Sequence, residues 1–291
     1  MMIRQAIAFA EVHKYTYDED STKRPSEDDP AAHRDRFVRQ ESQRRTFWSC
    51  FILDRILSVG ESGTRLIQVK HLSNLQIPCS DENFTSGRAV RTRLFGETDE
   101  AYAKRRKEIH EQVLQQYGGH EPPQIEWEDR HDEGMLGRLI LALDHFADVN
   151  EWSHNGGRRS EKPNIGPWNP ETKYYQLDKR LRDIKNELPT ELQLTSINTE
   201  NHVYETPSTT SRTYCLIHAI LQLSTAYLYL EYLPTYGFKL EKPQAPMDAP
   251  LVTEPVPADQ PDYWEDRAKN CLDYVRDFSY ERNRYDQWSA T

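Results

Sequence analysis

The 291-residue sequence lacks the features that identify several large protein classes. It has no run of about 18 apolar residues, which argues against a transmembrane helix and a membrane partner. Its first residues lack the long apolar core and small-residue cleavage site of a signal peptide. No repeat of about 20 to 50 residues is present, so a regular solenoid is excluded. The alternation of apolar and polar residues that is typical of β-strands is nearly absent.

Short motifs for cofactors and catalysis are also missing. The sequence contains no glycine-rich dinucleotide motif, phosphate loop, His-Glu-x-x-His or Gly-x-Ser-x-Gly. Cys50, Cys79, Cys215 and Cys271 form no Cys-x-x-Cys pair, so no zinc site is predicted, and a reducing compartment is the natural interpretation. We therefore expect no catalytic residues, no cofactor and no metal in this chain, and we predict that it is not an enzyme.

Positive charge is in short supply. Lysine and arginine number 37 against 47 aspartate and glutamate residues, giving a net charge of −10. A domain that binds nucleic acid by itself is usually basic on at least one face, so the charge argues against DNA binding by these residues alone. Protein or small-molecule partners fit it better. The hydrophobic fraction of 36% is low for a compact globule, which predicts that part of the chain is loop.

Apolar residues of the sequence do recur at the spacing of an α-helix. Residues 40–60 hold the densest run of large apolar side chains, from Phe47 to Val59, and Gly60 follows where a helix C-cap is expected. Because the run is apolar on nearly every side, it predicts a buried helix. Asp54 and Arg55 interrupt it. We expect these charges to bond to neighbouring helices, since a lone Asp-Arg dipeptide is not a catalytic arrangement.

The remaining periodicity predicts an all-α fold, an irregular multi-helix bundle around two buried apolar helices, at about 40–60 and 208–233. The predicted domains are a helical domain over 1–235, a proline-rich linker or loop over 236–260, and a C-terminal helix within 261–291 that packs on the same domain. Further helices are predicted at 2–13, 98–117, 129–153, 168–187 and 261–285, and loops or irregular segments at 14–37, 61–97, 154–169 and 195–207.

The only dense basic cluster lies in the predicted helix 98–117, which Thr98 is expected to cap. It consists of Lys104, Arg105, Arg106 and Lys107. Such a cluster can be a nuclear-import signal or a phosphate contact, and it can equally be the solvated face of a charged helix. We favour the solvated face and keep the import signal as the alternative.

Histidines next to acids invite a catalytic or metal-binding interpretation in two places. Asp144 and His145 are adjacent on a predicted helix and therefore point apart. His131, Asp132 and Glu133 are better explained as exposed residues at a helix N-terminus. His218, on the apolar helix 208–233, is expected to be a hydrogen-bonded core residue.

One stretch resembles a known family. The signature contains an acidic residue, two arginines, Thr-Phe-Trp, a short apolar run, Asp-Arg and Ser, followed by an Ile-Pro-Cys end at 77–79. These residues are Glu41, Arg44, Arg45, Thr46, Phe47, Trp48, Asp54, Arg55, Ser58 and Pro78. The pattern is similar to the fungal-specific transcription factor domain, the middle homology region of Zn2Cys6 zinc-cluster regulators, including the xylanolytic-activator-like group. The chain departs from that pattern after Arg65, where no proline follows.

The resemblance implies a nuclear, helical regulatory module of a fungal Zn2Cys6-type transcription factor. Its implied partners are the transcription machinery or co-regulator proteins and a small-molecule effector, for which we expect a pocket near the aromatic residues of the two buried helices. Zinc and DNA contact would belong to an upstream segment not present here, and the chain is expected to begin inside the domain. The signature residues are expected to maintain the core rather than to carry chemistry.

Two alternatives stay open. The first is a helical scaffold or truncated family relative without DNA-binding function. The second is a helical enzyme of unknown class, which a deep polar pocket holding His145 or His218 beside carboxylates would support.

Overall fold

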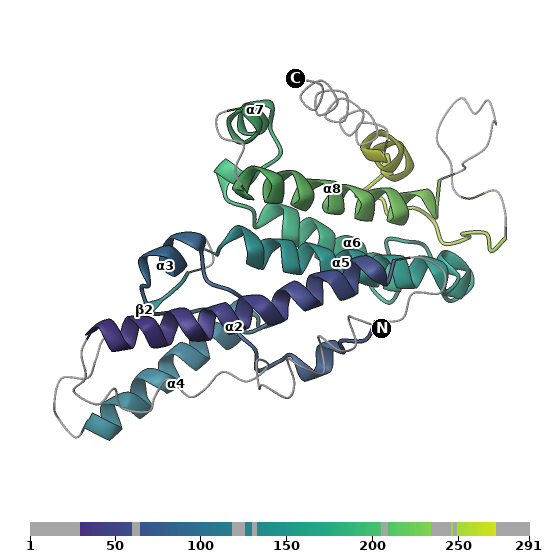
Figure 1. Ribbon diagram of the computed structural model, residues 1–291. Coiled ribbons are helices and arrows are strands. Elements are labelled where there is room, and N and C mark those ends of the chain that lie inside the picture. Colours follow the sequence, from purple (N-terminus) through teal and green to yellow (C-terminus); the bar gives the residue numbers. More distant parts are fainter. Residues whose placement is uncertain are drawn as a thin grey trace. The chain divides into compact units, whose positions relative to one another are not determined.

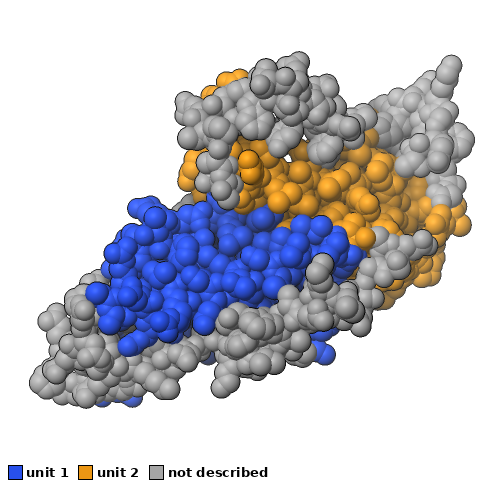
Figure 2. All heavy atoms as spheres, viewed as in Figure 1, with its two compact units in different colours: residues 1–58, 64–140 blue, residues 59–63, 141–291 orange. Residues whose placement is uncertain are grey.

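The computed structural model describes residues 30–59, 65–117, 126–129, 133–204, 209–233, 246 and 249–271. The chain divides into two compact units (Figure 2). Unit 1 comprises residues 1–58 and 64–140, and unit 2 comprises residues 59–63 and 141–291. The predicted boundaries at 235 and 260 stay predictions, because most of residues 234–248 lie outside the described part.

Unit 1 is built on long helices with a very small sheet (Figure 1). The sheet is a parallel pair of two-residue strands in which Val90 lies opposite Glu126 and Arg91 opposite Trp127. The described elements that begin in this unit are α2 (Pro30–Leu57), η1 (Val69–His71), α3 (Asp81–Ser86), β1 (Val90–Arg91), α4 (Asp99–Tyr117), β2 (Glu126–Trp127) and α5 (Met135–His154).

Unit 2 contains the part of α5 from residue 141 onward and a set of further helices. Helices α6 and α8 pack side by side (Figure 1). The other described elements are η3 (Gly157–Ser160), α6 (Lys173–Asn186), η4 (Thr190–Leu192), α7 (Ser196–Tyr204), α8 (Thr209–Leu230) and a helical segment at 263–271. The predicted all-α class is confirmed across the described residues.

Local chemistry explains where these helices begin. The hydroxyl of Thr98 accepts a hydrogen bond from the Ala101 backbone N–H at 3.2 Å, so it caps α4 as predicted. Thr172 caps α6 in the same way through the Tyr175 N–H. Helix α3 starts at the cap Ser80 and ends at Gly87, whose φ of 69° is a conformation that glycine adopts without strain.

An aromatic cluster forms the centre of unit 1. The ring of Trp48 is fully buried, and its centroid lies 5.1 to 5.6 Å from those of Phe47, Phe51 and Phe95. Its indole N–H donates to the Gln76 carbonyl at 2.9 Å. Edge-to-face packing of this kind adds to the hydrophobic contribution of burial. Trp48 therefore joins α2 to the chain segment that precedes α3.

Two expectations for the helix at 40–60 were wrong. Helix α2 begins at Pro30, inside a segment predicted as loop; proline favours the first helical position because its backbone needs no hydrogen-bond donor there. The helix is also not buried all round. Leu53, Ile56 and Leu57 are exposed, Leu57 by 62%, because the core contacts the face that carries Phe47, Trp48 and Phe51. Gly60 and the predicted helix 2–13 lie outside the described residues.

Short helices were missed where loops were predicted. Helix α3 falls inside 61–97, and α7 falls inside 195–207. Both are held by side-chain caps rather than by apolar periodicity: Thr195 accepts from the Asn198 N–H, and the Asn198 side chain donates to the carbonyl oxygens of Thr190 and Gln193. Helix α5 starts at Met135, six residues later than predicted at 129.

Candidate functional site

The family-signature residues of unit 1 attach α2 to the segment 65–81. The buried carboxylate of Glu41 accepts from Arg44, from Arg45 at 3.0 Å and from the Cys79 backbone N–H at 3.0 Å. Arg45 in turn donates to the Cys79 carbonyl and to Asp81, both at 2.8 Å. The acidic residue, the arginines and the Pro-Cys end of the signature therefore meet in one network, which has a structural role.

The second charged pair of the signature has a similar role, with a different partner from the one predicted. Asp54 accepts from the backbone N–H groups of Leu66 and Ile67 at 2.9 and 3.2 Å and pairs with Arg55 at 2.7 Å. Arg55 also donates to the Ile67 carbonyl. For Asp54 the predicted partner, a neighbouring helix, was wrong, because the loop after α2 supplies the backbone N–H groups that its carboxylate binds.

The remaining signature residues differ in exposure. Ser58 is buried at the end of α2, where its hydroxyl donates to the Arg55 carbonyl, and Pro78 is buried in the adjoining segment. Thr46 is exposed, and its hydroxyl donates to the Ser42 carbonyl one turn earlier. None of these contacts forms a site for chemistry.

The basic cluster on α4 is not uniform. Lys104 and Lys107 are strongly exposed, and each lies near a glutamate one turn later on the helix. Arg105 is mostly buried instead: it binds Glu97 at 2.8 Å and donates to the Thr92 carbonyl at 2.9 Å. Arg106 pairs with Asp129 at 3.2 Å. Two of the four cations thus bind neighbouring segments of unit 1, and an import signal here stays a prediction.

Of the three residues 131–133, the structure describes only Glu133. Glu133 is buried and precedes α5, where it pairs with Arg93 at 3.0 Å. The expectation of an exposed helix start was wrong for Glu133, because a distant arginine satisfies its charge. His131 and Asp132 lie outside the described residues.

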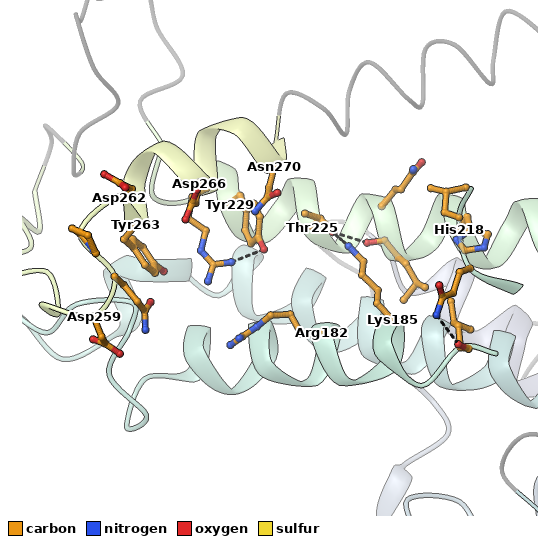
Figure 3. A pocket seen from close by; sticks show the side chains of 18 residues that line it. Arg182, Lys185, His218, Thr225, Tyr229, Asp259, Asp262, Tyr263, Asp266 and Asn270 are labelled. Atoms are coloured by element: carbon orange, nitrogen blue, oxygen red, sulfur yellow. Dashed lines mark hydrogen bonds between the residues drawn. The ribbon is translucent and has the colours of Figure 1, made fainter. Parts of the chain in front are cut away.

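Unit 2 contains a pocket of about 750 Å³ (Figure 3). One wall comes from α6 and the residues after it, a second from α8, and a third from residues 259–270. Figure 3 shows Lys185 and His218 toward one end of the pocket and Asp259, Asp262 and Asp266 toward the other, with Arg182 between them. The pocket is lined by Arg182, Lys185, Leu188, Gln193, Leu194, His218, Leu221, Gln222, Thr225, Tyr229, Asp259, Gln260, Pro261, Asp262, Tyr263, Asp266, Arg267 and Asn270.

Lys185 reaches across this pocket from α6 to α8. Its ammonium group donates to the Thr225 hydroxyl at 2.7 Å, and that hydroxyl donates to the Leu221 carbonyl at 3.0 Å (Figure 3). Withdrawal from water lowers the pKa of Lys185 to about 8, although the charge of Asp178 acts in the opposite direction. A partly buried ammonium group therefore lies within the pocket, still charged in most molecules at neutral pH.

The two arginines of the pocket are held by one buried carboxylate. Arg267 donates to both oxygens of Asp178, at 3.0 and 2.9 Å, and Arg182 pairs with the same residue at 3.2 Å. The Arg267 guanidinium also lies over the rings of Tyr229 and Tyr263, 4.7 and 4.9 Å from their centroids. This network anchors the segment 263–271 onto α6 and α8.

His218 and Gln222 are two further polar residues of α8 that line the pocket. His218 is buried, as predicted, and bonds through Nε2 to the Leu192 carbonyl at 2.9 Å. Burial lowers its pKa to about 4, so it is uncharged at neutral pH. Gln222 is also buried, and its Oε1 accepts no hydrogen bond from any residue that the structure describes. The Oε1 atom of Gln222 is therefore shut off from solvent and lacks a donor among the described residues.

The enzyme alternative required His145 or His218 beside carboxylates in a pocket. His145 lies on α5 outside the pocket lining, fully buried, and burial lowers its pKa to about 3. His218 does line the pocket, but Figure 3 shows it at the opposite end from Asp259, Asp262 and Asp266. The described residues therefore bring no histidine of this pocket together with a carboxylate for acid–base chemistry.

The pocket was predicted only in part. We expected it near the aromatic residues of both apolar helices, and α8 does contribute Tyr229, whereas α2 belongs to unit 1. No clear sequence signal marked Lys185 or Asp178, which belong to an ordinary charged helix. Gln222 and Thr225 were detectable as polar residues three apart in an apolar helix. Across the described residues, no group of three or more His, Cys, Asp or Glu could hold a metal, and no helix is apolar and long enough to cross a membrane.

Comparison with known proteins points to the same family as the signature. Residues 13–112 match the model of the fungal specific transcription factor domain. The chain is 23% identical over 193 residues to a Schizosaccharomyces pombe protein described as an uncharacterized transcriptional regulatory protein, which covers 65% of this chain. The chain spans 25% of that relative's length. No solved structure matches the chain.

The match includes the whole signature from Glu41 to Pro78 and most of α4. It ends before the pocket, whose lining begins at Arg182. Residues 13–112 of this chain are therefore similar to the fungal specific transcription factor domain family.

Proposed function

We propose that the chain is a regulatory, effector-sensing module in fungal transcription regulation, in which a small molecule bound by unit 2 alters the output. The family match and the regulatory relative support the transcriptional role. By analogy with the family, we also propose that the module acts in the nucleus, contacts co-regulators or the transcription machinery, and reaches DNA and zinc only through a zinc-cluster segment outside these residues.

The observation that carries effector sensing is the pocket itself. Its volume of about 750 Å³ is within the range of small-molecule sites, roughly 300 to 1,000 Å³. Leu188, Leu194 and Leu221 supply apolar surface, and most of the other lining residues are polar or charged. Three separate chain segments line it, so a bound molecule would contact α6, α8 and residues 259–270 together and stabilise one arrangement of them.

A tethered reporter tests this proposal. Residues 1–291 are fused to an unrelated DNA-binding domain, and transcription from a reporter with the matching site is compared with that domain alone. The fusion is expected to change reporter output, in a direction that the sequence does not specify. An output equal to that of the DNA-binding domain alone would contradict the transcriptional role and favour the scaffold alternative.

A matched pair of variants tests the role of the pocket. Leu194 lines the pocket and is 38% exposed, so Leu194→Trp can fill the cavity without being forced into a tight core. Leu216 on α8 is 39% exposed and does not line the pocket, so Leu216→Trp adds the same ring elsewhere. We expect Leu194→Trp alone to change the response of the reporter to growth conditions. Identical responses from both variants would show that the pocket has no part in regulation.

A further inference from the structure

Helix α8 is turned with polar side chains inward and leucines outward. Its buried polar residues are Ser211, His218, Gln222, Ser224 and Thr225. Leu216, Leu223 and Leu230 are instead exposed, by 39%, 38% and 47%. We infer that this outer face of α8 is the contact surface for a second copy of the chain, packed antiparallel against it.

The rotation of α8 about its own axis is fixed by contacts of the buried polar residues. His218 bonds to the Leu192 carbonyl at 2.9 Å. The Thr225 hydroxyl accepts from Lys185 of α6 at 2.7 Å (Figure 3). Because both contacts hold the polar side of the helix against neighbouring segments of unit 2, the leucines of the opposite side remain exposed to solvent.

The exposed leucines form an apolar stripe along α8. Leu216, Leu223 and Leu230 recur every seven residues, a spacing that keeps them on one side of a helix. Ala219 and Ala226, both partly buried, lie between them. Apolar surface that is continuous over several helical turns commonly marks a site of protein contact.

The absence of charge makes this face suitable for a second copy of an acidic chain. The net charge is −10, so two copies repel each other over most of their surface. From Thr213 to Leu230, however, the sequence contains no Asp, Glu, Lys or Arg. A membrane surface is a poorer match, because helices that lie on membranes usually carry lysine and arginine beside the apolar face.

The stripe is also nearly symmetric about Leu223. Leu216 and Leu230 each lie seven residues from it, and Ala219 and Ala226 lie four and three residues from it. A two-fold axis at Leu223 therefore places Leu216 of one copy against Leu230 of the other. Contact across such an axis requires a self-complementary surface, and the alternation of large and small side chains lets the two helices interdigitate.

Charges at the two ends of the stripe favour the antiparallel direction. Arg212 is exposed and lies one turn before Leu216, on the same side of the helix. Glu231 lies at the other end, where its carboxylate accepts from the Ser153 hydroxyl at 2.9 Å. An antiparallel pair brings each Arg212 towards the Glu231 end of the other copy, which is also the negative end of the helix dipole. A parallel pair would place the two Arg212 side chains together.

The length of the stripe predicts a weak dimer. Between Leu216 and Leu230 the helix rises by about 21 Å. A single helix pair of this length is smaller than the roughly 800 Å² per partner that stable interfaces commonly bury. We therefore expect two copies to associate at micromolar concentration and to separate on dilution.

Sedimentation velocity of the full chain at about 1 to 300 µM tests the inference. The wild-type chain is expected to change from monomer to dimer over this range. Leu223→Glu places two carboxylates at the two-fold axis and should remain a monomer. Leu251→Glu, at a position outside α8 that is 53% exposed, is the control that should dimerise like wild type. A wild-type chain that stays monomeric throughout, or a Leu223→Glu chain that still dimerises, would overturn the inference.

Two more variants test the arrangement of the helices. Arg212→Glu should weaken the dimer by about fivefold or more, because it brings an acid to the acidic end of the other copy. An unchanged dissociation constant would contradict the antiparallel direction. Leu216→Trp keeps an apolar side chain at the end of the stripe and should dimerise like wild type.

Urea unfolding at a concentration where the wild-type chain is monomeric separates this contact from one within the chain. Leu223→Glu and Leu251→Glu are expected to unfold at similar midpoints, because each replaces an exposed leucine. A much lower midpoint for Leu223→Glu would show that another part of the same chain covers Leu223, and it would overturn the inference.

Discussion

Replacing Trp48 is expected to cost more stability than almost any other single change in unit 1. The ring is fully buried, contacts three phenylalanine rings and donates to the Gln76 carbonyl at 2.9 Å. Truncation to alanine removes those contacts and leaves a cavity, and it also leaves a buried carbonyl without a donor. Large-to-small changes of this kind cost about 3 to 5 kcal/mol.

A second variant separates the contribution of the Trp48 hydrogen bond from that of ring packing. Trp48→Phe keeps an aromatic ring in the cluster and loses the hydrogen bond, for which the orphaned carbonyl of Gln76 sets a cost of about 1 to 3 kcal/mol. Trp48→Ala loses both. The order of stability is therefore expected to be wild type, then Trp48→Phe, then Trp48→Ala.

Urea unfolding of the whole chain, followed by far-ultraviolet circular dichroism, measures these differences through the shift of the midpoint. Leu57→Ala is the matched control, since Leu57 lies on the same helix and is 62% exposed, so its truncation is expected to change stability by less than about 0.5 kcal/mol. A Trp48→Ala variant that unfolds at the wild-type midpoint would refute the assignment of this ring to the core.

Four further predictions concern single residues. His145→Leu should raise the free energy of unfolding by about 1 kcal/mol at neutral pH, because both ring nitrogens of His145 are buried without a described partner. The variant should also lose less stability in acid, because burial lowers the pKa of His145 from 6.5 to about 3 and only the unfolded chain takes up this proton in that range. Lys185→Met should stabilise the fold most below about pH 8, because burial lowers the pKa of Lys185 from 10.5 to about 8 and its buried charge therefore opposes folding. The gain should shrink as the pH rises from about 8 towards 10.5, where the unfolded chain loses this proton too. Asp178→Ala should cost about 3 to 5 kcal/mol in thermal or urea unfolding, because it leaves Arg267 without its buried counter-charge; a loss below about 1 kcal/mol would contradict the network. Arg105→Ala should destabilise unit 1 more than Lys104→Ala does, because Arg105 binds Glu97 and Lys104 is exposed. If a fluorescent fusion still enters the nucleus after all four cluster cations are replaced, the cluster is not an import signal.

Much of the fold could be predicted because strong helical periodicity is local information. The apolar run from Phe47 and the capped helix starting after Thr98 were found this way, and so was α8. Helices α3 and α7 could not be found, since they depend on caps at Ser80 and Thr195 rather than on an apolar stripe. The exposed face of α2 was also missed, because periodicity reports which residues are apolar and not which of them a core of limited size can cover.

The functional site was harder to predict for a related reason. The signature residues are informative about family, yet Glu41, Trp48 and Asp54 all bind neighbouring chain segments within unit 1. The pocket depends on Lys185, Gln222 and Arg267, which are far apart in the sequence and meet only through the packing of α6, α8 and residues 263–271. No local pattern marks such a set.

We propose that the pocket of unit 2 holds a small-molecule effector. The most direct measurement is mass spectrometry of the small molecules released from purified chain after exposure to a dialysable cell extract. The wild-type chain and Leu216→Trp should release a common small organic compound that is missing from Leu194→Trp. Recovery of the same compounds from Leu194→Trp as from the other two chains would contradict the claim.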